Sequence, residues 1–303
     1  MSGTPSTTST PEVLVTGATG RIGGRLLELL TGSATPVRAI ARRPDQVDAL
    51  RRHGVDAARA DYDHPDGVRT AMQGCRQLFL VSTGDARGYD QDRATIDSAT
   101  ATGVEHVVKI SGSDANADSS VPWAADYGRS DDYLRASGLP FTILRPSCFM
   151  SNLEYLAPLI RRGFLPGTSG HGATTWTDPD DLAAAAHTVL TDPDRRGGSG
   201  DDGANHLLSS TQPLSFPQVA GILTDTLGHR VRYVHIPGPV MYAGMRAGGS
   251  DHRNAHGMVM QFADVVRHGR DDVRVFSTDL QDLIGRPGTT LGQFIDQHRD
   301  VFA

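Results

Sequence analysis

The sequence lacks the features that mark several large classes of protein. Its 303 residues include only two cysteines, Cys75 and Cys148, which excludes a disulfide scaffold and fits a reducing cytoplasm. No apolar run approaches the length of a membrane-spanning helix. The formal net charge of −6 provides no basic surface for nucleic acid or an anionic membrane. We therefore expect a cytoplasmic protein that acts on a small molecule, and a homodimer is compatible with the sequence.

The beginning of the chain also lacks an apolar pattern. Residues 1–11 are rich in Ser and Thr, so we expect a disordered tail and neither a signal peptide nor a membrane anchor. With 38% apolar residues in the whole sequence, the rest of the chain is long enough for one large domain and a smaller one.

Short β-rich runs alternate with amphipathic helical patterns through the first half of the chain. The predicted strands are residues 12–16, 36–41, 55–60, 77–82, 106–111 and 141–146. The predicted helices between them lie near 21–31, 45–53, 65–73, 88–102 and 125–137. This alternation predicts a doubly wound α/β fold, in which helices cover both faces of a parallel sheet and ligands bind at the carboxyl ends of its strands.

The pattern changes after Pro146. Helices are predicted near 149–162, 215–228 and 238–267, and a further helix opens with the stretch DPDDLAAAAHTVL. Short strands are predicted near 205–209 and 230–235, and residues 192–203 are predicted to form a surface loop. We expect residues 149–303 to form a smaller α/β lobe that encloses a substrate. Part of this segment can return to the first sheet.

The stretch EVLVTGATGRIGGRLLELL, residues 12–30, places three glycines between the first predicted strand and the first predicted helix. Gly17 allows a sharp exit from the strand, Gly20 allows backbone amides to approach a pyrophosphate, and Gly23 allows the helix to pack against the sheet. A tight turn without a ligand is the alternative. The pattern predicts that residues 12–148 are an NAD(P)-binding Rossmann domain, with contacts from Gly17, Thr19, Gly20, Arg21, Ile22 and Gly23.

The end of the second predicted strand distinguishes between the two nicotinamide cofactors. An acidic residue there would bind the ribose 2′-hydroxyl of NADH, but the sequence VRAIARRPD places Arg42 and Arg43 at that point. A guanidinium suits a 2′-phosphate, and Arg21 can add a second positive group. We therefore predict NADPH in preference to NADH, although solvated surface arginines are the alternative.

Two further strand ends lie on the expected path of the cofactor. Asp61 and Tyr62 follow the third strand, where an acid can bind the adenine edge beside the ring. Ser82 and Thr83 close the fourth strand, on the way toward the nicotinamide.

Four stretches together resemble one family. The chain resembles the NmrA-like, atypical short-chain dehydrogenase/reductases in VTGATGRIG, in the arginine after the second strand, in ADYDHPDGVRTAMQGC and in LRASGLPFTILRPSCFMSN. The later IGRPGTTLGQFI resembles the tail of the NADPH-dependent quinone reductase branch. The resemblance covers nearly the whole chain after residue 11. It implies a Rossmann domain with a small α/β substrate lobe, in a family that contains reductases and also cofactor-binding regulators without known catalysis.

The catalytic pair of the wider superfamily is missing. Ordinary members use a Tyr-x-x-x-Lys pair, in which the lysine lowers the pKa of the tyrosine so that it can protonate an alkoxide. Tyr127 is followed four residues later by Asp131, and a second alignment puts Tyr127 on the lysine position and Trp123 on the tyrosine position. Only Lys109 among the 29 basic residues is a lysine, and its place on the fifth strand argues against its supplying the pair.

Other residues are candidates for the catalytic and substrate sites. Ser111 matches the superfamily serine, and its hydroxyl could hold a carbonyl or quinone oxygen. Tyr127 shares a helical stripe with Trp123, so it is either a catalytic side chain or core packing. The predicted catalytic residues are Ser111 and Tyr127, and the predicted substrate wall is Trp123, Phe149, Met150 and Asn152.

No metal site is predicted. Asp251, His252 and His256 have helical metal-ligand spacing, but the glutamate of a metalloprotease helix is absent from this segment. Cys75 and Cys148 are predicted to be small buried hydrophobes.

Three functions are compatible with these features. The preferred one is an NADPH-dependent reductase that passes hydride to a quinone or similar flat, conjugated molecule, since such an acceptor needs no dedicated tyrosine acid. The first alternative is a non-catalytic regulator that binds the cofactor and senses redox state. The second is a specialised biosynthetic reductase of a carbonyl, enone or imine.

Overall fold

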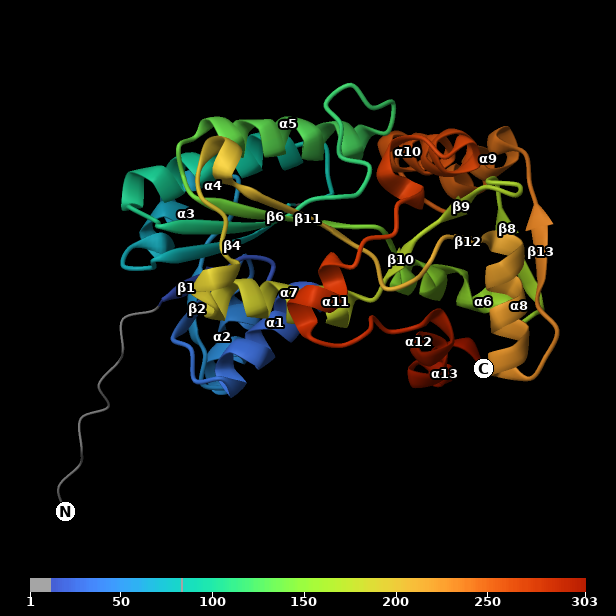
Figure 1. Cartoon of the computed structure of the whole chain (residues 1–303), viewed down its shortest axis with the longest axis horizontal. Helices are drawn as coiled ribbons and strands as arrows, with labels where there is room; N and C mark the ends of the chain where they lie inside the picture. The colour runs from blue at the N-terminus through green and yellow to red at the C-terminus, as the bar shows by residue number, and fades with distance from the viewer. Residues whose placement is uncertain (1–11, 83) are drawn as a thin grey trace, which may run out of the picture.

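The computed structural model describes residues 12–82 and 84–303. Residues 1–11, predicted as a disordered tail, and Thr83, predicted as a cofactor contact, lie outside the described residues. The described chain forms a larger lobe around a parallel sheet and a smaller lobe beside the carboxyl ends of its strands (Figure 1).

The larger lobe is built on a seven-stranded sheet whose paired strands all run parallel. Its order is β11-β6-β5-β4-β1-β2-β3. The strands are β1 (Val13–Val15), β2 (Val37–Ala41), β3 (Asp56–Arg59), β4 (Gln77–Val81), β5 (His106–Ile110), β6 (Phe141–Pro146) and β11 (Ala204–Leu208). The six strands predicted in the first half are confirmed, with each end displaced by at most one residue. The order reverses between β1 and β4, which opens a ligand crevice beyond their carboxyl ends.

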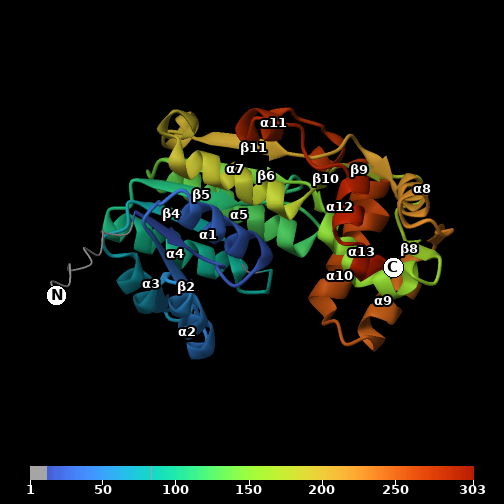
Figure 2. The same ribbon diagram turned by 90° about the horizontal axis from the view of Figure 1, so that it is seen from below.

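Helices cover both faces of this sheet (Figures 1 and 2). One face carries α1 (Arg21–Gly32), α2 (Pro44–Arg52), α7 (Pro179–Thr191) and α11 (Asp279–Ile284). The other carries α3 (Pro65–Met72), α4 (Gly88–Thr102) and α5 (Pro122–Ala136). The helix predicted at 125–137 begins earlier because Pro122 occupies its first turn, where a missing amide hydrogen costs nothing. The predicted doubly wound α/β fold is confirmed.

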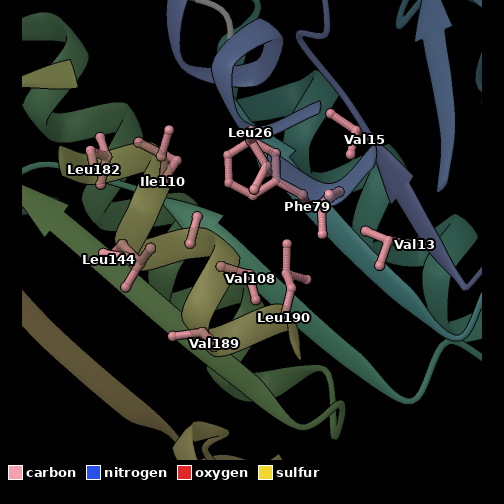
Figure 3. Close-up of a cluster of buried hydrophobic side chains, with 14 of the residues drawn as sticks. Val13, Val15, Leu26, Phe79, Val108, Ile110, Leu144, Leu182, Val189 and Leu190 are labelled. Atoms are coloured by element: carbon pink, nitrogen blue, oxygen red, sulfur yellow. The ribbon is translucent and has the colours of Figure 1, made fainter. Parts of the chain in front are cut away.

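Side chains alternate between two apolar cores because successive residues of a strand point to opposite faces. Val13, Val15, Phe79, Val108 and Ile110 point toward α1 and α7 (Figure 3). Leu14, Leu78, Leu80 and Val107 point toward the opposite face. Burial of each such side chain contributes roughly 1.5–3 kcal/mol. The same alternation turns Lys109, the neighbour of Val108, toward the face covered by α4 and α5.

The connection from β6 to β11 has an unusual hand. The sheet grows in one direction through β4, β5, β6 and β11, yet α4 and α5 lie on one face and α7 on the other. The last connection is therefore opposite in hand to the β4–α4–β5 and β5–α5–β6 units, which follow the usual right-handed rule. The chain passes through the smaller lobe between β6 and α7, and this excursion allows it to re-enter on the other face.

The smaller lobe contains short paired strands and a group of helices. Its strands are β7 (Cys148–Phe149), β8 (Phe164–Gly167), β9 (Ala173–Thr174), β10 (Trp176–Thr177), β12 (Leu214–Ser215) and β13 (Arg232–His235), paired β7 with β10, β8 with β13 and β9 with β12. Its helices are η1 (Met150–Leu156), α6 (Ala157–Ile160), α8 (Phe216–Leu227), α9 (Gly238–Ala247), α10 (His252–Met260), η4 (Gln261–Val266), η5 (Asp271–Arg274), α12 (Leu291–Gln297) and α13 (Arg299–Phe302). Trp176, Phe216 and Phe294 are central to its core.

Three segments of the second half differ from the sequence prediction. The helix predicted near 149–162 is a 3₁₀ helix, η1, followed by the four-residue helix α6. The helix predicted over 238–267 is divided into α9, α10 and η4, because the chain turns after Gly248 and Gly249 adopts a positive φ of 92°. The loop predicted at 192–203 contains two single-turn 3₁₀ helices, η2 (Pro193–Arg195) and η3 (Gly200–Asp202).

Asp181 joins the C-terminal segment to the larger lobe. Its completely buried carboxylate accepts hydrogen bonds from Arg286 Nη2 at 2.7 Å, the Thr289 amide at 2.6 Å, the Thr289 hydroxyl at 3.1 Å and Ser210 Oγ at 3.0 Å. The IGRPGTTLGQFI stretch thus has a structural role, since Arg286 and Thr289 bind it to α7. Within residues 12–82 and 84–303, no helix combines the length and apolar character needed to cross a membrane.

Candidate active site

A cavity of about 410 Å³ lies between the two lobes, at the carboxyl ends of β4, β5 and β6. The larger lobe contributes, among others, Ile22, Ser82, Ser111, Trp123 and Tyr127. The smaller lobe contributes, among others, Phe149, Asn152, Met258, Gln261 and Phe262. Most of its exposed lining is apolar, which suits a flat ligand with few polar groups.

The glycine turn leads directly to this cavity. Gly17 has a φ of +63°, and a Cβ on Gly23 would lie 2.3 Å from the carbonyl oxygen of Gly17, so neither position accepts a side chain without distortion. Gly20 caps α1, whose first turn has neither an acidic residue nor a side-chain cap. The free amides at this helix start can therefore bind an anion. The residues fit a pyrophosphate at the turn, and the side chain of Ile22 continues into the cavity wall.

The three arginines predicted for a 2′-phosphate have different surroundings. Arg42 is exposed after β2, and its guanidinium makes no hydrogen bond or ion pair within the described residues. Arg43 is also exposed and forms an ion pair of 3.3 Å with Asp45. Arg21 is engaged elsewhere, because its Nη1 and Nη2 donate to the carboxylate of Glu154 in η1 at 2.8 and 2.6 Å. This pair connects the glycine turn to the smaller lobe, and Arg42 is the guanidinium left available.

Asp61 and Tyr62 follow β3, as predicted. One oxygen of Asp61 accepts the Asp63 amide at 3.1 Å, and the other makes no hydrogen bond within the described residues. The Tyr62 hydroxyl donates to the Val81 carbonyl oxygen at 3.4 Å. Burial raises the pKa of Tyr62, so this side chain remains a neutral packing group beside the crevice.

Ser82 and Ser111 both line the cavity, and each binds a buried carboxylate behind it. Ser82 Oγ donates to Asp92 Oδ2 at 2.5 Å, and Ser111 Oγ donates to Asp131 Oδ2 at 2.6 Å. Lys109 Nζ lies between the two acids, 2.9 Å from Asp131 Oδ1 and 3.7 Å from Asp92 Oδ2. The positions of both serines are therefore set by the same buried ionic group.

Tyr127 and Trp123 of α5 line the cavity side by side on one helical face. Lys109, predicted not to supply the lysine of a Tyr–Lys pair, nevertheless lies near Tyr127, because the alternation of β5 brings Lys109 Nζ to 5.6 Å from the Tyr127 ring centroid. This contact is with the ring face, and no hydrogen bond links the two groups in the described residues. Burial and the charges of Asp114 and Asp92 raise the pKa of Tyr127, so it is a weaker acid than an ordinary tyrosine.

Sequence reasoning missed Asp114, which lies three residues after Ser111 and lines the cavity. Burial raises the pKa of Asp114 to about 6, against hydrogen bonds from its own backbone and from Gln261 that lower the pKa. Its position in the KISGSD stretch beyond the fifth strand was the available signal.

The residues predicted as a substrate wall differ in their positions relative to the cavity. Phe149 and Asn152 line the cavity, whereas Met150 is completely buried in the core of the smaller lobe and does not line it. Met150 points away because η1 begins there and turns this side chain toward Leu153 and Ile160. Residues far along the chain replace it, namely Asn254 and Met258 of α10 and Gln261 and Phe262 of η4.

The histidines of α10 have structural contacts. Asp251 caps α10 by accepting the Asn254 amide at 2.7 Å. His252 lies 2.9 Å from the Tyr242 hydroxyl and stacks on His256. Across residues 12–82 and 84–303, no three His, Cys, Asp or Glu side chains gather in a way that could hold a metal ion.

Comparison with known proteins identifies the family. The model of a family described as NAD(P)H-binding matches residues 17–193, more than half of the chain. The chain belongs to this NAD(P)H-binding family.

Three of the proteins to which the chain is similar are reductases. The chain is 29% identical over 291 residues to an NAD(P)H azoreductase of Xenophilus azovorans, covering 96% of this chain and 99% of the relative. The structure of the Escherichia coli quinone oxidoreductase QOR2 complexed with NADPH is similar at a TM-score of 0.84 and 27% identity, over 95% of this chain and 99% of the other. The Citrobacter sp. triphenylmethane reductase complexed with NADP(H) has a TM-score of 0.82 and 26% identity, over 94% and 99%. The predicted kinship with NmrA-like atypical short-chain reductases is confirmed.

The NAD(P)H-binding family model and the cavity overlap only in part. The matched segment begins at Gly17 and ends before the residues of α10 and η4 that close the cavity. The cofactor side is therefore shared with the NAD(P)H-binding family. The side formed by Asn254, Met258 and Gln261 lies outside the match.

Proposed function

We propose that the protein is an NADPH-dependent reductase that transfers hydride to a quinone or a similar flat, conjugated acceptor. The observation that carries this proposal is a mostly apolar cavity that adjoins the glycine turn and is closed by the smaller lobe. The similarity to an azoreductase, a quinone oxidoreductase and a triphenylmethane reductase supports it. A cavity that lies between the two lobes and has polar groups on its wall favours an enzyme over a sensor that needs only the cofactor site.

NADPH is the proposed cofactor. The amides at the start of α1 would hold its pyrophosphate, with contacts from Gly17, Thr19, Gly20, Ile22 and Gly23. Arg42, without a partner in the described residues, would bind the 2′-phosphate, and Arg43 would assist by giving up its weak surface pair with Asp45. Asp61 and Tyr62 would border the adenine, and Ser82 would lie beside the nicotinamide.

The residues of the cavity would position the acceptor. When bound, NADPH supplies the hydride, and the protein excludes water and fixes the geometry. Ser111 would turn its hydroxyl hydrogen from Asp131 to an acceptor oxygen, and Tyr127, with its raised pKa, would serve as a neutral hydrogen-bond donor. Trp123 and Phe149 would stack against the flat ligand, and Asn152 would contribute an amide.

Two broader features belong to the same proposal. We place the functional division of the chain near residue 148, with the cofactor on residues 12–148 and the substrate lobe on 149–303, although α7 and β11 return to the first sheet. A cytoplasmic location and a homodimer are further parts of this proposal.

The test is anaerobic consumption of NADPH with a panel of quinones, enones and simple ketones, with NADH in parallel. We expect quinone-dependent oxidation of NADPH, slower oxidation of NADH, and little turnover of simple ketones. Tight binding of NADPH without reduction of any acceptor would contradict the proposal and favour a regulator.

A further inference from the structure

The only lysine of the chain lies within a buried charged cluster behind the cavity wall. Lys109 is completely buried on β5, Asp92 comes from α4 and Asp131 from α5. The Nζ atom lies 2.9 Å from Asp131 Oδ1 and 3.7 Å from Asp92 Oδ2. We call Lys109, Asp92 and Asp131 the buried carboxylate cluster.

This cluster reaches the cavity through two hydroxyl groups. Asp92 Oδ2 is bound by Ser82 at 2.5 Å and by Ser130 at 2.6 Å, and Asp131 Oδ2 is bound by Ser111 at 2.6 Å. Ser82 and Ser111 line the cavity, whereas Ser130 is buried. A proton on Asp92 therefore has a single-hydroxyl path to the ligand space.

Charge balance points to a proton on the cluster. Two ionised carboxylates and one ammonium leave a net negative charge in a nearly dry site, which is strongly unfavourable. Asp131 holds the short contact to Lys109, so Asp92 is the acid with the weaker compensation. Burial raises the pKa of Asp92 against the lowering effect of Lys109 and the two serines, and Asp131 adds to the rise. An ionised Asp92 would also raise the pKa of Tyr62 and of Tyr127, and burial keeps both phenols neutral.

We propose that Asp92 stores a proton and delivers it through the Ser82 hydroxyl to the oxygen of the reduced acceptor. This inference rests on the proposed reductase function and supplies the proton donor that the missing Tyr–Lys pair does not provide. Asp92 and Lys109 would act through Ser82, so they are positioning residues rather than contacts of the substrate.

The step balances in atoms and charge. The acceptor gains the hydride with its electron pair while NADPH is oxidised to NADP⁺, and negative charge develops on an acceptor oxygen. In the protonated state, the O–H of Asp92 donates to Ser82 Oγ across the 2.5 Å contact, and the Ser82 hydrogen is free to point toward the acceptor. The O–H bond of Ser82 then breaks toward the acceptor oxygen, and Ser82 Oγ receives the proton of Asp92. Asp92 is left as a carboxylate, whose charge Lys109 compensates until a proton from solvent restores the acid.

The test compares two acceptors that differ in their need for a proton. A quinone takes up a hydride and a proton, whereas a cationic triarylmethane dye becomes neutral by taking up a hydride alone. We expect Asp92→Asn to lower quinone turnover at least tenfold, to remove the decline of its rate at high pH, and to leave dye turnover within twofold of the wild type. The matched control is Asp97→Asn on the exposed side of the same helix, which should change neither rate.

Two substitutions of Ser82 test the same path while they leave the buried carboxylate cluster unchanged. Ser82→Ala should lower quinone turnover as Asp92→Asn does, and Ser82→Thr should restore quinone turnover because threonine keeps a hydroxyl. Equal losses with both acceptors in Asp92→Asn would overturn the proposal, since they would indicate a merely structural role of Asp92. A selective loss in Asp114→Asn but not in Asp92→Asn would overturn it in favour of Asp114, the other buried acid on the cavity wall.

Infrared spectroscopy detects a protonated Asp92 without enzyme turnover, so it tests the stored proton separately from the reductase function. Infrared spectra of the protein at neutral pH should contain the C=O stretch of a protonated carboxylic acid that disappears in Asp92→Asn and persists in Asp97→Asn. If the wild type reduces no acceptor, the reductase function fails, while this band still reports whether Asp92 holds a proton. Absence of a band assignable to Asp92 overturns the stored proton even in an active enzyme.

Discussion

At the scale of single residues, cofactor choice depends on one exposed side chain. Arg42→Ala removes the guanidinium that is free to bind a 2′-phosphate, so we expect the Kd for NADPH to rise about tenfold or more while the Kd for NADH stays within a factor of two. Fluorescence titration of the reduced cofactors measures both constants. An equal rise for both cofactors would assign Arg42 a role other than phosphate recognition.

Arg43→Ala is the matched control for this prediction. Arg43 is the adjacent arginine, is also exposed, and already forms a pair with Asp45. Its removal should weaken NADPH binding less than the removal of Arg42.

Some residues of the site could be predicted from the sequence, and others could not. The glycine turn was readable because three glycines at fixed spacing have one common geometric cause, and the arginines after the second strand followed from it. The buried carboxylate cluster was not readable, because Asp92, Lys109 and Asp131 come from three elements and meet only when α4 and α5 cover β5. Arg21 was predicted on the phosphate but pairs with Glu154, more than a hundred positions later in the chain.

At the scale of elements, β5 carries a pH-sensitive group at the end opposite the cavity. His106 is buried, its Nε2 lies 3.2 Å from the Thr142 hydroxyl of β6, and burial lowers its pKa to about 4. The unfolded chain therefore binds more protons than the folded one between about pH 6.5 and pH 4. We expect this residue to cost up to about 3 kcal/mol of stability as the pH falls through that window.

Urea denaturation at a series of pH values tests this prediction. The free energy of unfolding of His106→Gln should rise relative to that of the wild type as the pH falls from 7 to 4, as the sign of the pKa shift requires. His53→Gln, at an exposed helix end, should show no such change relative to the wild type. A constant difference between His106→Gln and the wild type across the series would refute a buried neutral histidine.

The elements themselves were predicted unevenly. The six strands of the first half were accurate because each is a short β-rich run bounded by turn residues and followed by a helical pattern. The segment 238–267 was merged into one helix because its apolar spacing continues across Gly248 and Gly249. The π-helical geometry of η4, which brings Gln261 and Phe262 to the cavity, has no sequence signal of comparable strength.

At the scale of the whole molecule, Asp181 holds the C-terminal segment against the first sheet. Asp181→Asn keeps the shape of the side chain but removes the negative charge that accepts four hydrogen bonds from Ser210, Arg286 and Thr289. We expect a loss of about 2–4 kcal/mol in the free energy of unfolding, measured by urea denaturation. The cost is moderated because the Arg286 side chain is 53% exposed and can be solvated.

Asp180→Asn is the control for this change. Asp180 is the preceding residue of α7, with a side chain 59% exposed and a long contact of 3.7 Å to Arg25. Its substitution should alter stability by less than about 1 kcal/mol. Equal effects of the two substitutions would show that Asp181 is not the critical connection.

The arrangement of the two lobes could be anticipated only in outline. A smaller lobe after the sixth strand followed from the change of pattern, and a return to the sheet was allowed. The reversed hand of the β6–β11 connection and the crossing of the C-terminal segment to α7 depend on contacts between residues more than a hundred positions apart. Periodicity within a short window carries no information about such contacts.

The complete burial of Lys109 gives the molecule a chemical property of its own. No other lysine exists in the sequence, so the folded protein offers no lysine side chain to a reagent that modifies amines. Labelling of Lys109 then requires the sheet and the helices α4 and α5 to separate. The extent of its acylation over time measures how often the native fold opens, without any engineered probe.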